Sequence, residues 1–253
     1  MIRTVWAMIV AIVVTIPCTT VVIVAGLFGA RDREGGVYDL MQRTWARGLL
    51  WGAGVRVVLH GSEQVRSGRQ IVVGNHVSWF DVLAVAAFVP RARFVAKQEV
   101  RRIPLVGPAA AAAGHVYIAR DNRKAAFEQY KDAAERIHDG ARVIVFAEGT
   151  RGYDYPLRPF KKGPFVLAVS AGVPIVPLLV HGTIPMMPKG SFRIRGGTAH
   201  LHFLPPIPTT GLGYEDRDRL AVMTRAAIGA ALEREYGVTS PPWDPRAARA
   251  ASA

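Results

Sequence analysis

The first thirty residues contain an uncharged segment that limits what the chain can fold into. No charged residue occurs between Arg3 and Arg31, and the run TVWAMIVAIVVTIPCTTVVIVAGLFGA is mostly apolar. A helix needs about 20 apolar residues to cross a bilayer, and this run is longer. We therefore expect residues 1–30 to be a membrane anchor. Because Pro17 lies near the middle of the run, a kinked span, a re-entrant pair of half-helices and one straight helix all fit the pattern.

A cleaved signal peptide is the alternative interpretation of this segment. Its apolar part would be about 7–15 residues long and would precede a small-residue cleavage site such as A-x-A. The run here is longer, and no clear A-x-A site follows it. Arginines are more frequent after the run than before it, because Arg31, Arg33, Arg43 and Arg47 follow and Arg3 alone precedes. By the positive-inside tendency, we expect the rest of the chain on the cytoplasmic face of the cell membrane.

The segment from Tyr38 to Trp51 (YDLMQRTWARGLLW) mixes Leu, Met and Trp with Arg. This composition fits a helix that lies along the membrane interface. It fits a buried amphipathic helix of the main domain equally well.

The charge of the chain implies an anionic partner. The 253 residues include 32 Lys and Arg against 19 Asp and Glu, for a formal charge of +13. Nucleic acid, anionic lipid and a phosphorylated substrate all match such a charge. The single cysteine, Cys18, excludes an intramolecular disulfide and a multi-cysteine zinc site. The histidines are not spaced as a metal cluster along the chain, and we expect neither a metal nor a cofactor.

The remainder of the chain alternates β-rich runs with helical patterns. The β-rich runs are short and several are continuously apolar: Val55–Leu59, Ile71–Val73, Arg93–Ala96, His115–Ile118, Val143–Ala147, Ile175–His181 and His200–Leu204. The segments 122–138 and 217–236 carry apolar residues on one helical stripe, the second through Leu220, Met223, Ala227 and Ala231. This alternation predicts an α/β domain over residues 31–240, with a mostly parallel sheet flanked by helices. Residues 241–253 lack periodicity and are expected to be a loose tail.

One motif suggests acid–base chemistry. The strand at 71–73 is followed by GNHVSWFDV, which places His76 and Asp81 five positions apart. Within one continuous helix these side chains would diverge by about 140°. If the chain instead leaves a strand at His76 and begins a helix near Ser78, Asp81 can reach back to the imidazole. A carboxylate on one imidazole nitrogen prepares the other nitrogen to act as a general base.

A purely structural interpretation of the same residues also exists. Ser78-x-x-Asp81 fits a helix capping box, and an acidic residue near a helix N-terminus is common for electrostatic reasons. His76 would then be an ordinary polar residue in a turn.

A second group of polar residues follows the strand predicted at 143–147. It consists of Glu148, Gly149, Thr150 and Arg151. In open α/β sheets, ligands bind in the crevice outside the carboxyl ends of the strands. The guanidinium of Arg151 offers a bidentate donor suited to phosphate, so these residues are candidates for substrate binding. The alternative interpretation of Arg151 is a surface charge or a structural ion pair without a role in binding.

Lys97 begins a basic stretch that continues through Arg101 and Arg102. The stretch is either a solvated face of the domain or a patch that meets anionic lipid headgroups. Each cation near such a surface contributes about 1 kcal/mol, and the apolar N-terminus favours the second interpretation.

Four segments in this order resemble the PlsC-type glycerolipid acyltransferases. Asn75-His76-Val-Ser-Trp-Phe-Asp81 is similar to the NHxxxxD block of that family, and Gly114-His-Val-Tyr-Ile-Ala-Arg120 to its G-x-x-x-[IV]-x-R block. FAEGTR, which ends at Arg151, resembles FPEGTR with Ala147 in place of proline, and VPIVP at 173–177 completes the set. The resemblance covers roughly residues 55–183.

The resemblance implies a fold, a reaction and a set of site residues. The family transfers an acyl chain from acyl-CoA or acyl-carrier protein to a glycerol hydroxyl. His76 would deprotonate that hydroxyl, and Asp81 would orient His76. Arg120 and Arg151 would bind the phosphate of the acceptor, and Glu148 would hold the acceptor or the geometry of the motif. The expected reaction is acylation of lysophosphatidic acid by residues 31–240, with anionic membrane lipids as further partners.

Other functions remain open on the sequence alone. Another lysolipid, such as a lysophospholipid or a lyso-ornithine lipid, would suit the same motifs. A non-catalytic protein that binds anionic lipid is the alternative from a different class. We do not expect nucleic-acid binding, because no recognised motif for it occurs and it would leave the apolar run unexplained. An esterase is disfavoured because the G-x-S-x-G motif is missing.

Overall fold

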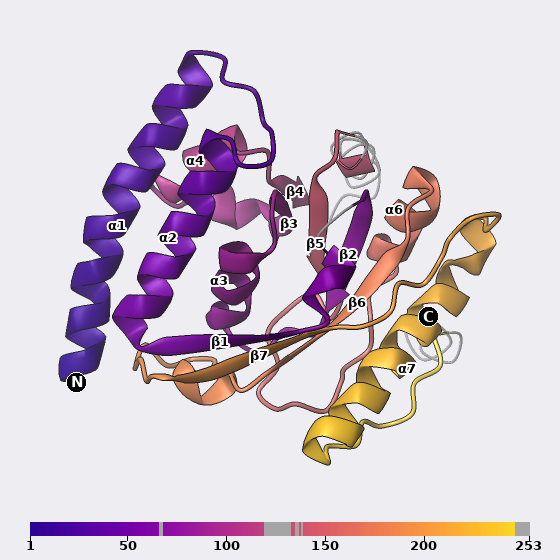
Figure 1. Cartoon of the computed structure of the whole chain (residues 1–253). Coiled ribbons are helices and arrows are strands. Elements are labelled where there is room, and N and C mark those ends of the chain that lie inside the picture. The colour runs from indigo at the N-terminus through magenta and orange to yellow at the C-terminus, as the bar shows by residue number, and fades with distance from the viewer. Residues whose placement is uncertain (66–67, 119–132, 135–136, 138, 246–253) are drawn as a thin grey trace.

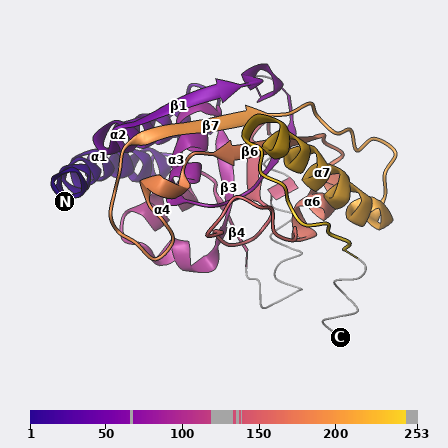
Figure 2. The ribbon, with the colours of Figure 1, turned by 90° about the horizontal axis from the view of Figure 1, so that it is seen from below.

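The computed structural model describes residues 1–65, 68–118, 133–134, 137 and 139–245 (Figure 1). The described part forms a seven-stranded sheet with helices on both faces and a pair of long N-terminal helices at one side (Figure 2). The predicted α/β class is therefore confirmed.

The apolar N-terminal run forms one continuous helix, α1 (Ile2–Leu27), with Pro17 inside it. Among the described residues it is the one helix long and apolar enough to cross a membrane. It packs against α2 (Val37–Ala53), as Figure 1 shows. Two glycines of α2 make this approach close, because a Cβ at Gly52 would lie 2.7 Å from the side chain of Val10 and one at Gly48 would lie 2.9 Å from that of Val14.

Helix α2 has a buried side and an exposed side. Tyr38, Ala46 and Leu50 are buried, and the helix packs against both α1 and α3 (Trp79–Phe88). Leu40 and Trp51 are exposed on its other side. The segment is thus an amphipathic helix of the main domain, as the second interpretation of its sequence proposed.

All seven predicted strands are present, in the order β1-β7-β6-β2-β5-β3-β4. Neighbouring strands pair in parallel, except that β6 and β7 are antiparallel. The strands are β1 (Val55–His60), β2 (Gln70–Gly74), β3 (Ala92–Lys97), β4 (Val116–Ile118), β5 (Arg142–Phe146), β6 (Ile175–His181) and β7 (Gly197–Phe203).

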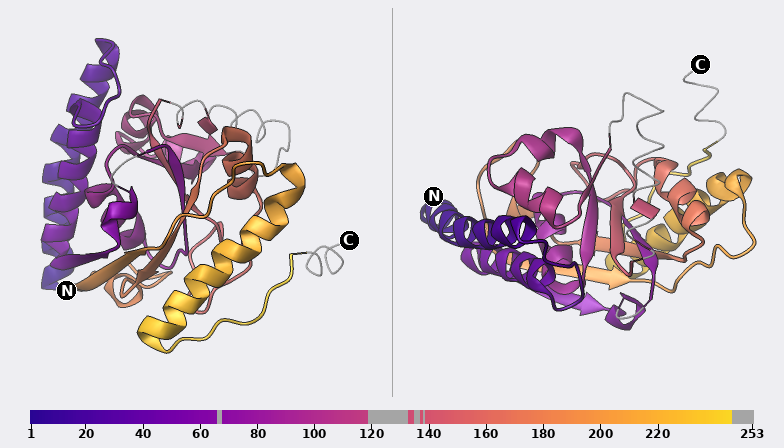
Figure 3. Two further views of the ribbon diagram at one scale, coloured as in Figure 1. Left: turned by 45° about the vertical axis from the view of Figure 1, so that its right-hand side comes forward. Right: turned by 90° about the horizontal axis from the view of Figure 1, so that it is seen from above.

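Apolar side chains project from both faces of the sheet, because helices cover both faces. In β2, Val72 packs into the core shared with α2 and α3, whereas Ile71 and Val73 pack toward α6 (Gly163–Ala171) and α7 (Arg217–Tyr236). Figure 3 shows α1 and α7 on opposite sides of the sheet. The remaining helical elements are α4 (Val106–Ala112) and four short 3-10 segments: η1 (Ser62–Val65), η2 (Gln98–Arg102), η3 (Ile184–Met186) and η4 (Tyr214–Asp216).

Helix α7 has the predicted bounds, but its buried stripe differs from the predicted one. Met223, expected in the apolar stripe, is 41% exposed, whereas the polar Thr224 and Arg225 are buried. The Arg225 guanidinium donates hydrogen bonds to the carbonyls of Leu157 and Pro241. A buried arginine that satisfies backbone carbonyls is not visible in a hydrophobic pattern.

Residues 241–245, at the start of the predicted loose tail, contact the domain at one side chain. They have no helix or strand, but the Trp243 ring packs on Phe160 and lies under the Arg225 guanidinium. Residues 246–253 of the predicted tail, and most of the helix predicted at 122–138, lie outside the described residues.

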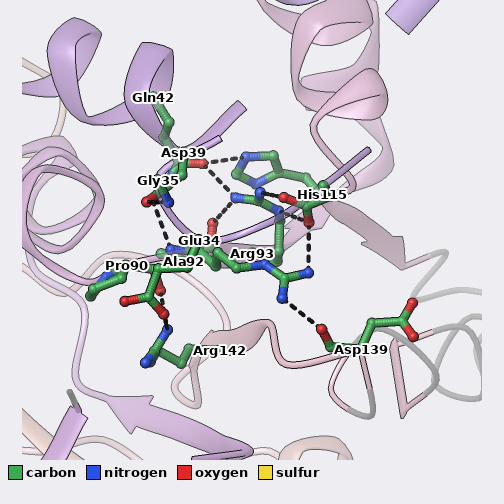
Figure 4. A network of polar contacts seen from close by, with 12 residues as sticks. Glu34, Gly35, Asp39, Gln42, Pro90, Ala92, Arg93, His115, Asp139 and Arg142 are labelled. Atoms are coloured by element: carbon green, nitrogen blue, oxygen red, sulfur yellow. Dashed lines mark hydrogen bonds and ion pairs between the residues drawn. The ribbon is translucent and has the colours of Figure 1, made fainter. Parts of the chain in front are cut away.

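Ion pairs attach the turn between α1 and α2 to the sheet. The side chain of Arg93 is fully buried and pairs with Asp32 over 2.6 Å, and Arg142 pairs with Glu34 over 2.9 Å. Asp39 accepts a hydrogen bond from the backbone N–H of Arg91. Figure 4 shows this polar network beneath α2. Burial lowers the pKa of Arg93, and the neighbouring Asp32 opposes that shift. The network fixes the helical pair relative to β3 and β5.

Candidate active site

His76 lies in the turn between β2 and α3, outside the carboxyl end of a central strand. The preceding residue, Asn75, is buried, and its side chain donates to the Val180 carbonyl over 3.0 Å and accepts from the Val180 N–H over 2.8 Å. This pair of hydrogen bonds joins the turn to β6. Sequence reasoning quoted Asn75 in a motif but assigned it no role.

Asp81 reaches back to His76, as the motif predicted. It lies in the first turn of α3, and its Oδ2 is 2.8 Å from Nδ1 of His76. The same oxygen accepts the backbone N–H groups of Val77 and Ser78 over 2.6 and 2.8 Å. Ser78 caps the helix and forms a capping box with Asp81. The catalytic and the structural interpretations of the spacing therefore describe one arrangement, since a single carboxylate does both.

Thr183 completes the environment of this carboxylate. Its hydroxyl donates to Oδ1 of Asp81 over 2.5 Å, and both side chains are fully buried. Sequence reasoning missed Thr183, because it follows β6 and is 102 residues away from Asp81. No local motif marks such a residue.

These contacts define the state of the imidazole. In the neutral imidazole, a carboxylate that accepts from Nδ1 places the ring proton there and leaves the lone pair on Nε2. Within the described residues, Nε2 has no hydrogen-bond partner. The ring stacks on Phe146 with centroids 4.3 Å apart, and His76 lines a cavity. An imidazole held in this way is able to accept a proton from a hydroxyl group in the cavity.

Glu148 contacts both Arg158 and the turn that contains His76. It is 5% exposed, and its carboxylate pairs with the Arg158 guanidinium over 2.8 Å and accepts the Arg158 N–H over 3.2 Å. A longer contact of 3.4 Å joins it to the backbone N–H of His76. Of the two roles expected for Glu148, these contacts support holding the motif in place. Arg158 was missed because it lies ten residues after Glu148, outside any motif.

The next three residues, which the sequence offers as candidates for substrate binding, line the cavity. Gly149 has φ of 78°, a conformation that favours glycine, and turns the chain after β5. Thr150 and Arg151 follow it along the cavity wall. The Arg151 guanidinium lies 5.2 Å from the Trp79 ring centroid, and within the described residues it forms no ion pair. Lys189, which sequence reasoning missed, lines the same cavity.

Two further residues of the sequence-based site are not tested, because the structure describes only the backbone of Lys97 and nothing of Arg120. Lys97 is the last residue of β3, adjacent to β4. Arg120 lies outside the described residues. Both remain predictions from the sequence.

The cavity has a volume of about 420 Å³ and two kinds of wall. His76, Arg151 and Lys189 supply basic groups. Most of the other lining side chains are apolar and come from α1, α2, α3, β3 and α4, among them Val22, Met41, Trp45, Val82, Ala109 and Ala113. The arrangement joins a general base and cations to a space suited to an aliphatic chain.

Comparisons with known proteins agree with this description. Residues 56–181 match the family described as Acyltransferase. The chain is 38% identical over 163 residues to a 1-acyl-sn-glycerol-3-phosphate acyltransferase of Limnanthes douglasii. This alignment covers 64% of this chain and 58% of the relative. It is 34% identical over 178 residues to the Homo sapiens 1-acyl-sn-glycerol-3-phosphate acyltransferase alpha, covering 69% and 63%. The chain thus spans about three fifths of the length of these curated relatives.

A solved structure is similar over almost the whole chain. The crystal structure of the 1-acyl-sn-glycerophosphate (LPA) acyltransferase, PlsC, from Thermotoga maritima superposes with a TM-score of 0.79 at 27% identity. The match covers 95% of this chain and 97% of that one. It therefore includes the N-terminal helical pair as well as the sheet.

Proposed function

Because the chain belongs to the acyltransferase family, we propose that it transfers an acyl chain from a thioester to the free hydroxyl of 1-acyl-sn-glycerol 3-phosphate, forming phosphatidic acid. The observation that carries this proposal is the geometry of His76. Asp81 contacts its Nδ1, its Nε2 has no partner among the described residues, and the residue lines a cavity with cations and apolar walls.

The reaction follows from that geometry. Nε2 of His76 accepts the proton of the acceptor hydroxyl, and the oxygen attacks the thioester carbonyl. A carbon–oxygen bond forms, the carbon–sulfur bond breaks, and the thiolate takes the proton from the imidazolium. Asp81 stabilises that imidazolium and keeps the ring oriented. No covalent acyl-enzyme is required.

Arg151 and Lys189 are the groups that we assign to the phosphates of the substrates. Both line the cavity together with His76, and Arg151 can donate two parallel hydrogen bonds to one phosphate. The relatives are named as acyltransferases of 1-acyl-sn-glycerol 3-phosphate, an acceptor that carries a phosphate. Arg120 is a further candidate by its motif. The donor is acyl-CoA or acyl-carrier protein.

The apolar wall between α1, α2 and α4 is the proposed place of an acyl chain. Transfer of an aliphatic chain from water to such a wall is favourable by about 0.8 kcal/mol per CH₂ group. The wall includes Val22 of α1 and Met41 of α2, so the membrane-associated end of the protein would contribute directly to substrate binding.

Membrane attachment is proposed to occur through the outer side of α1. One side of this helix is buried against the protein through Ala7, Val10 and Val22, whereas Trp6, Ile9 and Val13 are exposed. The exposed Trp51 of α2 packs against Trp6, with ring centroids 5.9 Å apart. A helix buried on one side along its length suits insertion parallel to the surface better than a free span. If α1 spans the bilayer instead, the arginine distribution places the catalytic domain on the cytoplasmic face.

The test is thioester turnover by the purified protein in detergent. Wild type and His76→Ala are compared with lysophosphatidic acid and a panel of other lysolipids, using acyl-CoA and acyl-carrier protein as donors. We expect thiol release that requires lysophosphatidic acid and that falls at least 100-fold in His76→Ala. Release with another lysolipid alone would contradict the acceptor. Binding of lipid without any turnover would indicate a non-catalytic protein, and turnover unaffected by His76→Ala would refute the mechanism.

A further inference from the structure

Three histidines gather on the face of the sheet opposite to α3. His60 ends β1 and is the register partner of His202 in β7, and His200 precedes His202 by two residues on the same face. The intervening Leu201 packs into the core shared with α2 and α3. Because side chains alternate along a strand, the three imidazoles lie on the other face, where α7 packs against β6. His76 and its cavity are associated with the α3 side.

The ring nitrogens of these three residues are close enough to share one ion. One nitrogen from each lies within 4.8 Å of the others, and Nε2 of His60 is 3.3 Å from Nδ1 of His200. Two imidazoles on one tetrahedral Zn²⁺, with bonds of about 2.0–2.1 Å, have their nitrogens roughly 3.3 Å apart. Imidazole is a good ligand for Zn²⁺, Cu²⁺ and Ni²⁺. The sheet register thus assembles a ligand set that the spacing along the chain does not reveal.

The cluster also has a candidate supporting hydrogen bond. Nε2 of His202 is 2.8 Å from the hydroxyl of Tyr236, the last residue of α7. Tyr236 is in turn stacked on His181 with centroids 3.6 Å apart. Histidine ligands commonly donate their second N–H to such an acceptor. When Nε2–H of His202 donates to Tyr236, Nδ1 keeps the lone pair that a metal requires.

Burial differs across the cluster in a way that permits entry of an ion. His202 is buried, His200 is half-buried and His60 is exposed. The rings of His60 and His202 are now stacked, 4.1 Å apart and almost parallel. An ion cannot lie in both ring planes at once in that arrangement, so the His60 ring has to turn, and its exposure to solvent allows this.

We propose that His60, His200 and His202 bind one divalent transition-metal ion of the Zn²⁺ class. The ion would join the edge strand β1 to β7, and Tyr236 would link that site to the end of α7. The site is separate from the proposed reaction, which needs no metal. Its expected effect is on thermal stability, because a ligand that binds only the folded state raises the melting temperature.

The experiment uses the full chain in detergent, purified without a polyhistidine tag and freed of metal by a chelator. Co²⁺ and Zn²⁺ are titrated, with the visible absorption of Co²⁺, calorimetry and the melting temperature as readouts. We expect one ion per chain, a tetrahedral Co²⁺ spectrum and a rise in melting temperature. His60→Ala and His200→Ala should weaken binding at least about 10-fold, and Tyr236→Phe, which keeps the ring, about 10–100-fold.

The matched control is His76→Ala, which removes a histidine outside the cluster and should bind the ion as wild type does. Circular dichroism checks that each variant is folded, and the exposed His60 provides a substitution that the fold should tolerate. Wild-type protein without Co²⁺ absorption at millimolar metal would overturn the proposal and leave ring stacking and the His60–His200 hydrogen bond as the relations between the histidines. Undiminished binding in both His60→Ala and His200→Ala would overturn it as well.

Discussion

The hydroxyl of Thr183 donates a hydrogen bond over 2.5 Å to the Asp81 carboxylate, on the oxygen that does not contact His76. The other oxygen accepts three N–H groups, from His76, Val77 and Ser78. Asp81 is fully buried, so these contacts replace its solvation. The carboxylate is thereby held in the one orientation that presents it to Nδ1 of His76.

Asp81→Asn should lower kcat for acyl transfer by about 10²–10⁴-fold. The amide retains the shape of the side chain but carries no charge to stabilise the His76 imidazolium. The measurement is thiol release under saturating donor and acceptor, with circular dichroism to confirm folding. A loss smaller than about 10-fold would contradict the role given to Asp81.

Thr183→Val should reduce both stability and rate. Valine has the same shape but leaves Oδ1 of Asp81 buried without its donor, a cost of about 1–3 kcal/mol in the free energy of unfolding. We expect a fall in kcat of about 10-fold. Thr183→Ser, which keeps the hydroxyl, is the control and should remain close to wild type. Equal behaviour of the valine and serine variants would show that the hydrogen bond contributes nothing.

Arg158→Ala should destabilise the turn that contains Glu148. The substitution removes the guanidinium 2.8 Å from a buried carboxylate, which leaves that charge unpaired at a cost of about 1–3 kcal/mol. The partial exposure of Arg158 keeps this below the cost for a fully buried pair. A urea-unfolding double-mutant cycle with Glu148→Gln measures the coupling. Additive effects of the two substitutions on the free energy of unfolding would show that Arg158 and Glu148 are not energetically coupled.

Ala110→Leu should shift donor preference toward shorter acyl chains. Ala110 of α4 lines the cavity, and leucine would occupy part of the apolar space. We expect kcat/KM for long-chain donors to fall up to about 10-fold relative to short-chain donors. This is the size of the change in kcat/KM that one methylene group in an apolar pocket causes. Ala111→Leu, one position along the same helix and outside the lining residues, is the control. An unchanged chain-length profile in Ala110→Leu would place the acyl chain elsewhere.

Stability should fall as the pH is lowered from 6.5 to about 4. Burial lowers the pKa of His181 to about 4, and the neighbouring His200 adds to the shift. Tyr155 and Tyr236 stack on the ring. Because the unfolded state then binds more protons in this range, the stabilising contribution is present above pH 6.5 and is lost progressively toward pH 4, by at most about 3 kcal/mol.

The measurement is urea unfolding at several pH values with chelator present, so that no metal contributes. His181→Gln should show a shallower dependence on pH than wild type does. Identical slopes for the two proteins would mean that protonation of His181 does not oppose folding.

The parts of this protein that the sequence determined by itself are those in which the interacting residues are close along the chain. Apolar runs predicted the seven strands, the stripe in 217–236 predicted α7, and the step from His76 to Asp81 predicted their contact, because a strand-to-helix turn brings them together locally. The tertiary structure alone decided which distant groups complete each site. Thr183 reaches Asp81 across 102 residues, Asn75 reaches Val180 across 105, and His60 reaches His200 across 140. The physical reason is that a local pattern encodes burial and turns, whereas strand order and register determine which ends of separate strands become neighbours.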